Sequence, residues 1–382
     1  MNVSRKRLVT DLSRLVQIPS YLECETIARH VLGELKKMGL AAQVDSGGNV
    51  LATLGSGGPG LLLNAHLDTV PPGDYEGDPL SGKVVAGRVL GRGSSDDKAG
   101  VAAMLEIARL LQGRALNQRV TLAFSVWEES TARGANGSYQ IARECGAKRG
   151  IILESTMSPN GKAMSVNVGC KGIMNLHITV KGKAYHSGKP HRGINAVSRA
   201  AEVVRQFEKL FATETMPRKT YRVWNKDVEL VTLATVTEIE ARQGTNVIPG
   251  ACQIVANCRL LPDGDDGEIV RRMKRLAAEL PKGWITWKSS RRILGHICED
   301  EGLVAACREA ISETGLRATS EIMSGRTDTT IFQHEGGIQS IVMGPGTIGT
   351  AHTKDEFVAV DHLVRGTEAV LRAVEKVTNC EV

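Results

Sequence analysis

Residues 61–66, LLLNAH, decide the fold of this 382-residue chain. A short, nearly continuous apolar run of this kind is typical of a strand that is buried on both faces of a parallel sheet. Two similar runs follow at 120–128 (VTLAFSVWE) and 150–155 (GIILES), and helical patterns at 26–39 and 97–113 alternate with them. Each helical pattern ends at a glycine, a residue that can terminate a helix. This alternation predicts an α/β domain with a mostly parallel sheet and flanking helices.

The pattern changes between residues 172 and 290. It predicts the order strand, helix, strand, strand, helix, strand, with one strand over 228–236 and helices over 195–209 and 266–280. That order is the split βαβ arrangement of a small α+β domain with a ferredoxin-like fold. Alternating helices and strands resume after residue 290. We therefore expect a discontinuous first domain, residues 1–171 and 291–382, that carries an insertion of residues 172–290.

Composition and charge argue against a nucleic-acid-binding, membrane-spanning or exported protein. Lys and Arg number 48 against 42 Asp and Glu, and the basic residues are spread along the chain, so the sequence predicts no nucleic-acid partner. The apolar runs are too short for a membrane span. In the N-terminal segment, Asp11 and Arg14 interrupt any apolar core of a signal peptide, while Leu8, Leu12, Leu15 and Val16 mark one face of an amphipathic helix. We expect a cytoplasmic protein.

The cysteine content also predicts a cytoplasmic protein. None of the eight, which include Cys145 and Cys380, forms a CxxC pair, and they are too sparse for a disulfide framework in a chain of this length. We expect them to be reduced thiols.

Several acidic and histidine residues stand where apolar runs end. His66 ends the first run, Glu128 and Glu129 follow the second, and Glu154 follows GIIL in the third. Ligands of open parallel sheets bind outside the carboxyl ends of the strands, so these side chains could converge on one crevice. Loops supply Asp96 and Asp97 in GRGSSDDKAG and His352 in GPGTIGTAHTKDE.

Two histidines and three carboxylates form a mixed nitrogen and oxygen donor set, which suits zinc, cobalt or manganese. The five candidate ligands are His66, Asp96, Glu129, Glu154 and His352. A two-metal site needs one bridging ligand, and a carboxylate can bridge with its two oxygens. Three carboxylates and one hydroxide would cancel the four charges of two divalent ions.

Glu128 would then be a carboxylate without a metal to bind. It could take the proton from a metal-bridging water and pass it to the leaving nitrogen. Neighbouring residues on a strand point to opposite faces, so Glu128 and Glu129 can both serve only if the chain leaves the strand there. Asp68 is the expected acceptor for the second ring nitrogen of His66.

The sequence resembles the dinuclear zinc peptidase and deacylase family, which includes acetylornithine deacetylase, succinyl-diaminopimelate desuccinylase, aminoacylase and glutamate carboxypeptidases. The matching segments run in the family's order from about residue 64 to residue 356. They are NAHLDTVPPGD, GRGSSDDKAG, WEES, LEST, AYHSGKPHRGINA, TNVIPGA, CRLLPDGD, SGRTD and GPGTIGTAHTKDE. The resemblance therefore covers most of the chain.

This resemblance implies a role for each candidate ligand. His66 and Glu154 would hold one metal ion, Glu129 and His352 the other, and Asp96 would bridge the two. Zinc is the expected metal, with cobalt and manganese as alternatives, and Glu128 would be the general base and acid.

The resemblance also makes the inserted domain a lid and dimerisation module, so we expect a homodimer. His186 would reach the partner subunit's site and stabilise the tetrahedral oxyanion. Asn246 and Arg259 would contact the substrate, Arg259 by gripping a carboxylate with two hydrogen bonds.

Several positions depart from the family pattern. Asp97 stands beside Asp96, and Asp96 is our choice for the bridge because it keeps the family's interval from the GRG turn. Trp127 and Arg326 lie where the substrate's side chain is expected. Arg326 could bind a second carboxylate of the substrate, or close an ordinary surface ion pair.

We therefore expect an amidohydrolase that cleaves a small N-acyl amino acid or a short peptide. A di- or tripeptidase of the same family is the first alternative, and it would require a free amino group on the substrate. Hydrolysis of a ureido compound would use the same metals. A catalytically silent metal-binding scaffold is a further alternative, against which Glu128 argues, because a degenerate site has no reason to keep a base beside complete ligands.

Overall fold

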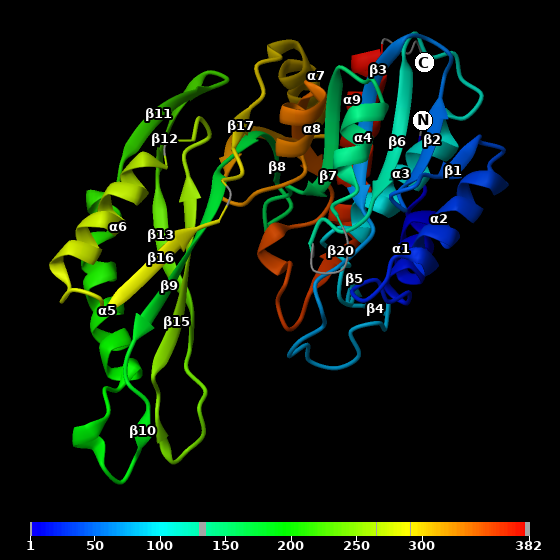
Figure 1. Cartoon of the computed structure of the whole chain (residues 1–382). Helices are drawn as coiled ribbons and strands as arrows, with labels where there is room; N and C mark the ends of the chain where they lie inside the picture. The colour runs from blue at the N-terminus through cyan, green and yellow to red at the C-terminus, as the bar shows by residue number, and fades with distance from the viewer. Residues whose placement is uncertain (1, 130–134, 265, 291, 379–382) are drawn as a thin grey trace. The chain divides into compact units, whose positions relative to one another are not determined.

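The computed structural model describes residues 2–129, 135–264, 266–290 and 292–378 (Figure 1). Contacts divide the chain into two compact units. Unit 1 comprises Met1–Gly169, Cys298–Ile322 and Thr327–Val382, and unit 2 comprises Cys170–Ile297 and Met323–Arg326. Arg291, at the expected second boundary, lies outside the described residues. Each unit has its own sheet and is described by itself.

The sheet of unit 1 is parallel at its centre, as the sequence predicts. Its strands follow the order β1-β2-β6-β3-β7-β19-β8, and β18 also pairs with β8. β3 pairs in parallel with β6 and β7, and β7 with β19, whereas β1, β2 and β8 join antiparallel. The bounds are β1 Ala42–Val44, β2 Val50–Leu54, β3 Pro59–His66, β6 Arg119–Ser125, β7 Arg149–Ser155, β8 Ala163–Cys170, β18 Arg317–Met323 and β19 Gln339–Gly344.

Helices cover this sheet. Their bounds are α1 Arg5–Val16, α2 Glu25–Lys37, α3 Lys98–Leu111, α4 Ser138–Glu144, α7 Glu301–Glu313, α8 Thr329–Gly336 and α9 Val360–Thr378. α1 buries Leu8, Leu12, Leu15 and Val16, which confirms the predicted amphipathic face. α3 is buried around most of its circumference because it contacts β3 on one side and α1 and α9 on others. A small sheet of β4 (Val84–Val85), β5 (Arg88–Leu90) and β20 (Phe357–Ala359) completes the unit.

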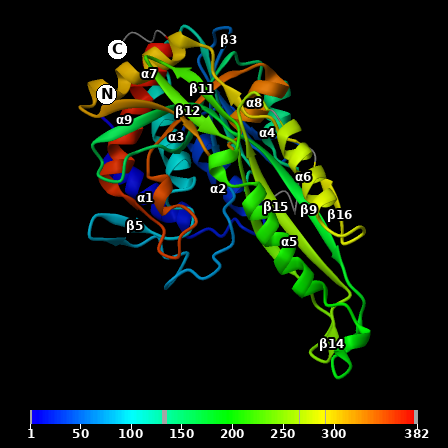
Figure 2. The same ribbon diagram turned by 90° about the vertical axis from the view of Figure 1, so that its left-hand side faces the viewer.

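Unit 2 has an antiparallel sheet in the order β13-β15-β9-β16. Its elements are β9 Gly172–Lys181, α5 Ala196–Leu210, β13 Leu233–Glu240, β15 Ala251–Leu260, α6 Gly267–Glu279 and β16 Ile285–Ser289. The short strands β10 (Tyr185–His186) and β14 (Val247–Ile248) pair separately, and β17 (His296–Ile297) follows β16. Figure 2 shows α5 lying along β9 and β15, which it contacts.

The single strand predicted over residues 228–236 is wrong. β12 (Lys226–Val231) ends there and pairs with β11 (Arg218–Val223) as a hairpin, and β13 then begins at Leu233 and pairs with β15. The N–H of Thr232 between them donates to the carbonyl of Pro217 at 3.0 Å. The run VELVTLATV contains neither glycine nor proline, so no local signal marks the break.

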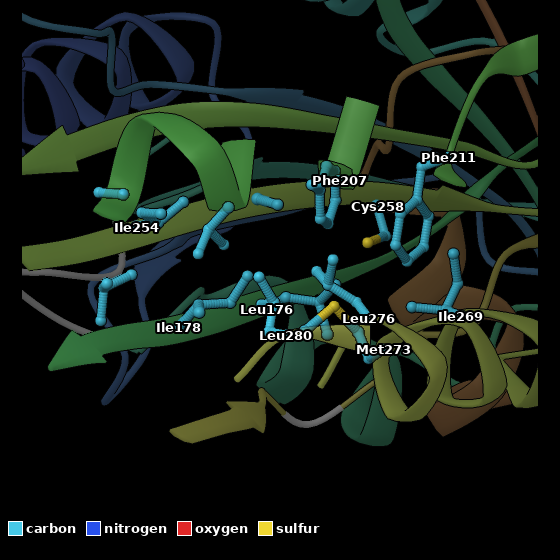
Figure 3. Close-up of a cluster of buried hydrophobic side chains, with 14 of the residues drawn as sticks. Leu176, Ile178, Phe207, Phe211, Ile254, Cys258, Ile269, Met273, Leu276 and Leu280 are labelled. Carbon is cyan, nitrogen blue, oxygen red and sulfur yellow. The ribbon is translucent and has the colours of Figure 1, made fainter. Parts of the chain in front are cut away.

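The core of unit 2 lies between its sheet and its two helices (Figure 3). On β9 burial alternates, and Leu176 and Ile178 point inward. α5 contributes Phe207, and α6 contributes Met273 and Leu276. The period of two in the strand and the helical period of α5 and α6 therefore meet in one apolar layer.

Two further predictions concern membrane and redox properties. Within the described ranges, no helix is both long and apolar enough to cross a lipid bilayer. The seven described cysteines are free thiols, of which all but Cys145 are buried. Cys380 lies outside the described residues.

We predict that Leu176→Ala destabilises unit 2 by roughly 2–5 kcal/mol, because it opens a cavity in a fully buried layer. The measurement is urea unfolding followed by tryptophan fluorescence, since Trp224, Trp284 and Trp287 of the four tryptophans lie in unit 2. Val197→Ala on α5 is the control, because Val197 is 42% exposed and should change stability by less than about 0.5 kcal/mol. Equal effects of the two variants would contradict the assigned core.

Candidate metal centre

The three parallel strands β3, β6 and β7 bring their carboxyl ends to one edge of the sheet of unit 1. His66 is the last residue of β3 and is in register with Ser125, the last residue of β6. Glu154 stands one residue before the end of β7. The structure therefore places these side chains at the edge where ligands of parallel sheets bind.

Glu128 and Glu129 lie beyond the end of β6. Trp127 has a φ of 63°, in the left-handed region, so the chain turns out of the strand direction there. This turn meets the condition for Glu128 and Glu129 to serve the same site.

The carboxylate of Asp68 holds that turn. Its Oδ1 accepts the N–H of Glu128 and its Oδ2 the N–H of Glu129, each at 3.0 Å. Asp68 is 1% exposed. A buried carboxylate needs such donors, and two donors on consecutive residues fix the orientation of the main chain.

Both nitrogens of the His66 ring face oxygen atoms. Its Nδ1 lies 2.9 Å from the main-chain oxygen of Asp68 and 3.6 Å from the Asp68 carboxylate. The nearest acceptor therefore comes from Asp68 as expected, but it is the carbonyl. An Nδ1–H donated to that carbonyl leaves Nε2 as the nitrogen with a free lone pair. Nε2 faces Asp96 Oδ1 at 3.1 Å.

Asp96 lies between the two histidines. Its second oxygen, Oδ2, is 3.3 Å from His352 Nε2, and the same nitrogen is 2.6 Å from Glu129 Oε1. Asp97 has a different position: its Oδ2 accepts the main-chain N–H of His66 at 3.2 Å. Of the two neighbouring aspartates, Asp96 is thus the one whose two oxygens reach both histidines.

Two groups of side chains have ligand atoms within 4.8 Å of one another. They are His66 with Glu128 and Glu129, and Asp96 with Glu129 and His352. Within the described part of the chain, neither group includes Glu154. Its carboxyl is nevertheless close to both, because burial and the charges of Glu128 and Asp96 raise its pKa well above the usual range.

The electrostatics of this cluster favour a cation. Burial alone would raise the pKa of Asp96, but hydrogen bonds with His352 and His66 outweigh burial and lower it. Hydrogen bonds to Asp96 and Glu129 raise the pKa of His352 to about 10. Burial and the neighbouring Asp96 raise the pKa of Asp97, although His66 opposes this. Crowded carboxylates beside two imidazoles are the donor set of a divalent metal ion, so the residues present fit such a group.

Two residues with predicted roles in catalysis and substrate binding, His186 and Asn246, lie side by side in unit 2. His186 is in register with Val247 on β14, and the N–H of Ser187 donates to the carbonyl of Asn246 at 2.9 Å. His186 and Asn246 are both exposed. The Nδ1 of His186 accepts the N–H of Gly188 at 3.0 Å.

A cationic cluster, Lys171 with Arg259 and Arg326, also lies in unit 2. The N–H of Lys171 donates to the carbonyl of Met323 at 3.1 Å, which brings the segment of Arg326 beside the start of β9. Burial and the charge of Arg326 lower the pKa of Arg259, and burial and the charge of Arg259 lower that of Lys171. The sequence predicted roles for both arginines but missed Lys171.

Glu356 is a second residue that the sequence analysis missed. It stands four residues after His352, and its carboxylate accepts the N–H of Asp96 at 3.1 Å. The segment GPGTIGTAHTKDE contains it, but an acidic residue in a polar loop gives no sign of being fully buried.

Two curated relatives of this chain are a desuccinylase and a deacetylase by name. It is 27% identical over 340 residues to a succinyl-diaminopimelate desuccinylase of Methylobacterium radiotolerans, which covers 86% of this chain and 83% of that protein. It is also 27% identical over 340 residues to an acetylornithine deacetylase of Myxococcus xanthus, with 85% and 83% covered.

Solved structures share the fold. A metallo-carboxypeptidase from Sulfolobus solfataricus superposes with a TM-score of 0.77 at 17% identity, over 97% of this chain and 99% of that one. A tripeptidase from Staphylococcus aureus gives a TM-score of 0.76 at 22% identity, over 99% and 100%.

Residues 62–376 match the family described as Peptidase family M20/M25/M40. This span includes every predicted ligand, all of unit 2 and most of unit 1. The chain therefore belongs to peptidase family M20/M25/M40, whose members hydrolyse amide or peptide bonds with divalent metal ions.

Proposed function

We propose that this chain is a two-metal amidohydrolase that releases the amino acid from a small N-acyl amino acid. The observation that carries the proposal is the position of Asp96, whose two oxygens each face a different histidine. That is the arrangement needed by a carboxylate that bridges two ions.

The proposed ligands form two sets that share one residue. His66 and Glu154 would hold one ion, Glu129 and His352 the other, and Asp96 would contact both. Nitrogen and oxygen donors suit zinc, with cobalt and manganese as alternatives. When bound, such ions supply Lewis acidity that polarises the scissile carbonyl and makes a water more acidic.

Glu128 would move the proton. Its carboxylate belongs to the same group of ligand atoms as those of His66 and Glu129, and it is close enough to Glu154 to raise the pKa of that residue. From there it can accept a proton from the attacking water and deliver it to the leaving nitrogen. Asp68 positions it, since the N–H of Glu128 is anchored on the Asp68 carboxylate.

An acidic substrate is supported by the cationic cluster of unit 2. Burial lowers the pKa of both Arg259 and Lys171, and each also feels the positive charge of another member of the cluster. An anion from the substrate would relieve that repulsion. Arg259 would grip one carboxylate and Arg326 a second one, which agrees with a succinyl or otherwise acidic N-acyl amino acid and with the name of the desuccinylase relative.

A di- or tripeptidase is the second candidate. The fold that this chain shares with a tripeptidase is consistent with that function. Hydrolysis of a ureido compound would need the same ligands. Glu128 argues against a silent scaffold, because its carboxylate lies among the proposed ligands without being one of them.

We also propose that the segment 172–290 is a lid and dimerisation domain. His186, exposed beside Asn246, would then stabilise the oxyanion in the site of the partner subunit. Asn246 would contact the substrate in the same place.

The first prediction concerns the substrate. With zinc, cobalt or manganese added, the purified protein should release free amino acid from N-acetyl or N-succinyl amino acids. Glu128→Gln should lower kcat by roughly 10²–10⁴-fold, because it removes the proton acceptor, and should leave metal content unchanged. Activity confined to unblocked dipeptides would select the peptidase alternative. Two bound ions with no hydrolysis of any substrate would favour the silent scaffold.

The second prediction concerns Asp68. Asp68→Asn replaces one of the two accepting oxygens by an amide NH₂, which faces a main-chain N–H and repels it. We expect kcat to fall by roughly 10–100-fold. Asp300→Asn is the matched control, since Asp300 also accepts a main-chain N–H, at the start of α7, away from the ligands. Unchanged kcat in Asp68→Asn would show that the site does not need this anchor.

The third prediction concerns the partner subunit. Glu128→Ala and His186→Ala subunits should each be inactive alone. Mixed after denaturation and refolding, they should regain up to about one quarter of wild-type activity if His186 acts across a dimer, since half of the dimers would be mixed and each would hold one intact site. Mixtures that stay inactive at every ratio would sink the shared site.

A further inference from the structure

Another buried carboxylate of unit 1, Glu356, contacts the loop that carries Asp96. It is 0% exposed and directly precedes β20. Within the described ranges, neither group of candidate ligand atoms contains it. Burying a carboxylate is costly unless charge and hydrogen bonds compensate it, so its partners indicate what it does.

Those partners are the main chain of the Asp96 loop and one arginine. Glu356 Oε1 accepts the N–H of Ser95 at 3.0 Å and the N–H of Asp96 at 3.1 Å. Oε2 lies 2.8 Å from Nη1 of Arg92, which is 4% exposed. The other end of the Arg92 guanidinium donates to the carbonyl of Pro72 at 3.2 Å. One carboxylate therefore ties together three segments that are distant in sequence.

The main chain of Glu356 strengthens the same connection. Its carbonyl accepts the N–H of Gly91 at 3.1 Å and the hydroxyl of Tyr75 at 3.0 Å. The residue thus grips both ends of the loop that precedes α3, Gly91 through its carbonyl and Asp96 through its side chain.

Ser95 extends the connection to the other ligands. The hydroxyl of Ser155, which directly follows Glu154, donates to the carbonyl of Ser95 at 2.7 Å. The N–H of Thr347, in the loop that carries His352, donates to the hydroxyl of Ser95 at 3.2 Å. The loop held by Glu356 therefore also touches the segments of Glu154 and His352.

From these contacts we infer that Glu356, paired with Arg92, is a positioning residue that sets the main chain of Asp96 so that its two oxygens face both histidines. The inference rests on the proposed function, in which Asp96 contacts both ions. Two donors on consecutive residues leave the Asp96 peptide little freedom to rotate. Without this anchor, one of the two contacts, 3.1 Å to His66 or 3.3 Å to His352, would lengthen.

Glu106 provides a matched control for a role in stability alone. It is also 0% exposed and lies in the same unit, on α3. It too accepts a main-chain N–H, from Ser4 at 2.8 Å, and pairs with an arginine, Arg7, at 2.6 Å. Its partners belong to α1, to the residue before α1 and, through Arg109 at 3.6 Å, to α3 itself, so it resembles Glu356 in chemistry and differs in what it holds.

The experiment compares Glu356→Gln with Glu106→Gln in the full-length protein. Each protein is stripped with a chelator and titrated with zinc and with cobalt by calorimetry, and unfolding is measured in parallel. We expect both variants to lose stability. With either metal, only Glu356→Gln should bind the less tightly held of the two ions in the site roughly 10–100-fold less tightly. Wild-type affinity for both ions in Glu356→Gln, or an equal loss in Glu106→Gln, would overturn the inference.

Arg92 gives a second pair of variants in case Glu356→Gln does not fold. Arg92→Lys keeps the positive charge beside Glu356 and should retain most of the affinity for the less tightly held ion. Arg92→Gln removes the charge and should lower the affinity for the less tightly held ion roughly 10-fold or more. Equal affinities in these two variants would contradict a role for the ion pair. Wild-type protein that binds two ions but hydrolyses no substrate would refute the proposed function and leave this inference standing.

Discussion

Buried carboxylates that accept main-chain N–H groups hold the site of unit 1 together. Three of them are not proposed ligands, and each holds a different ligand-bearing segment. Asp68 anchors the turn of Glu128 and Glu129, Asp97 accepts the N–H of His66, and Glu356 accepts the N–H of Asp96. The carboxylates among the proposed ligands repel one another, so they do not order their own loops. Order must come from groups that bind the backbone, and hydrogen bonds from main-chain donors to charged acceptors are strong enough to supply it.

This arrangement has an electrostatic consequence. The anchoring carboxylates add negative charge around ligands that are already acidic. Part of that charge is neutralised locally, since Arg92 pairs with Glu356. Burial, together with the charges of neighbouring carboxylates, raises the pKa of Asp97 and of Glu154. A pair of divalent cations would lower the energy of every ionised carboxylate in the cluster at once, so metal binding and loop order are expected to reinforce each other.

The sequence predicted the parts of this structure that depend on local pattern. The apolar runs that end at His66 and Glu154 are strands, and the four apolar residues of α1 face the core. The interval from the GRG turn selected Asp96 over Asp97, and the geometry supports that choice as a proposal. The sequence could not show the break at Thr232, because a run of strand-forming residues does not reveal that the chain changes partners there. It missed Glu356 and the anchoring role of the Asp68 carboxylate for a related reason. The role of a buried acid depends on which main-chain N–H groups it binds, and here those groups are far away in sequence.

In the proposed function, different units supply the metal ligands and the groups that would bind an acidic substrate. All five proposed ligands and Glu128 belong to unit 1, whereas Lys171, Arg259 and Arg326 belong to unit 2. The two sets are built on different principles. In unit 1 the charged groups sit at the ends of parallel strands and are fixed by backbone donors, so a displaced side chain would disturb several ligands at once. In unit 2 the cations come from strand β15, the residue before β9 and a short returning segment. In the proposed function, exchanging one of these cations would leave the hydrogen bonds among the proposed ligands of unit 1 in place, so a change of acyl group or amino acid would be easier to make in unit 2 than a change of reaction in unit 1.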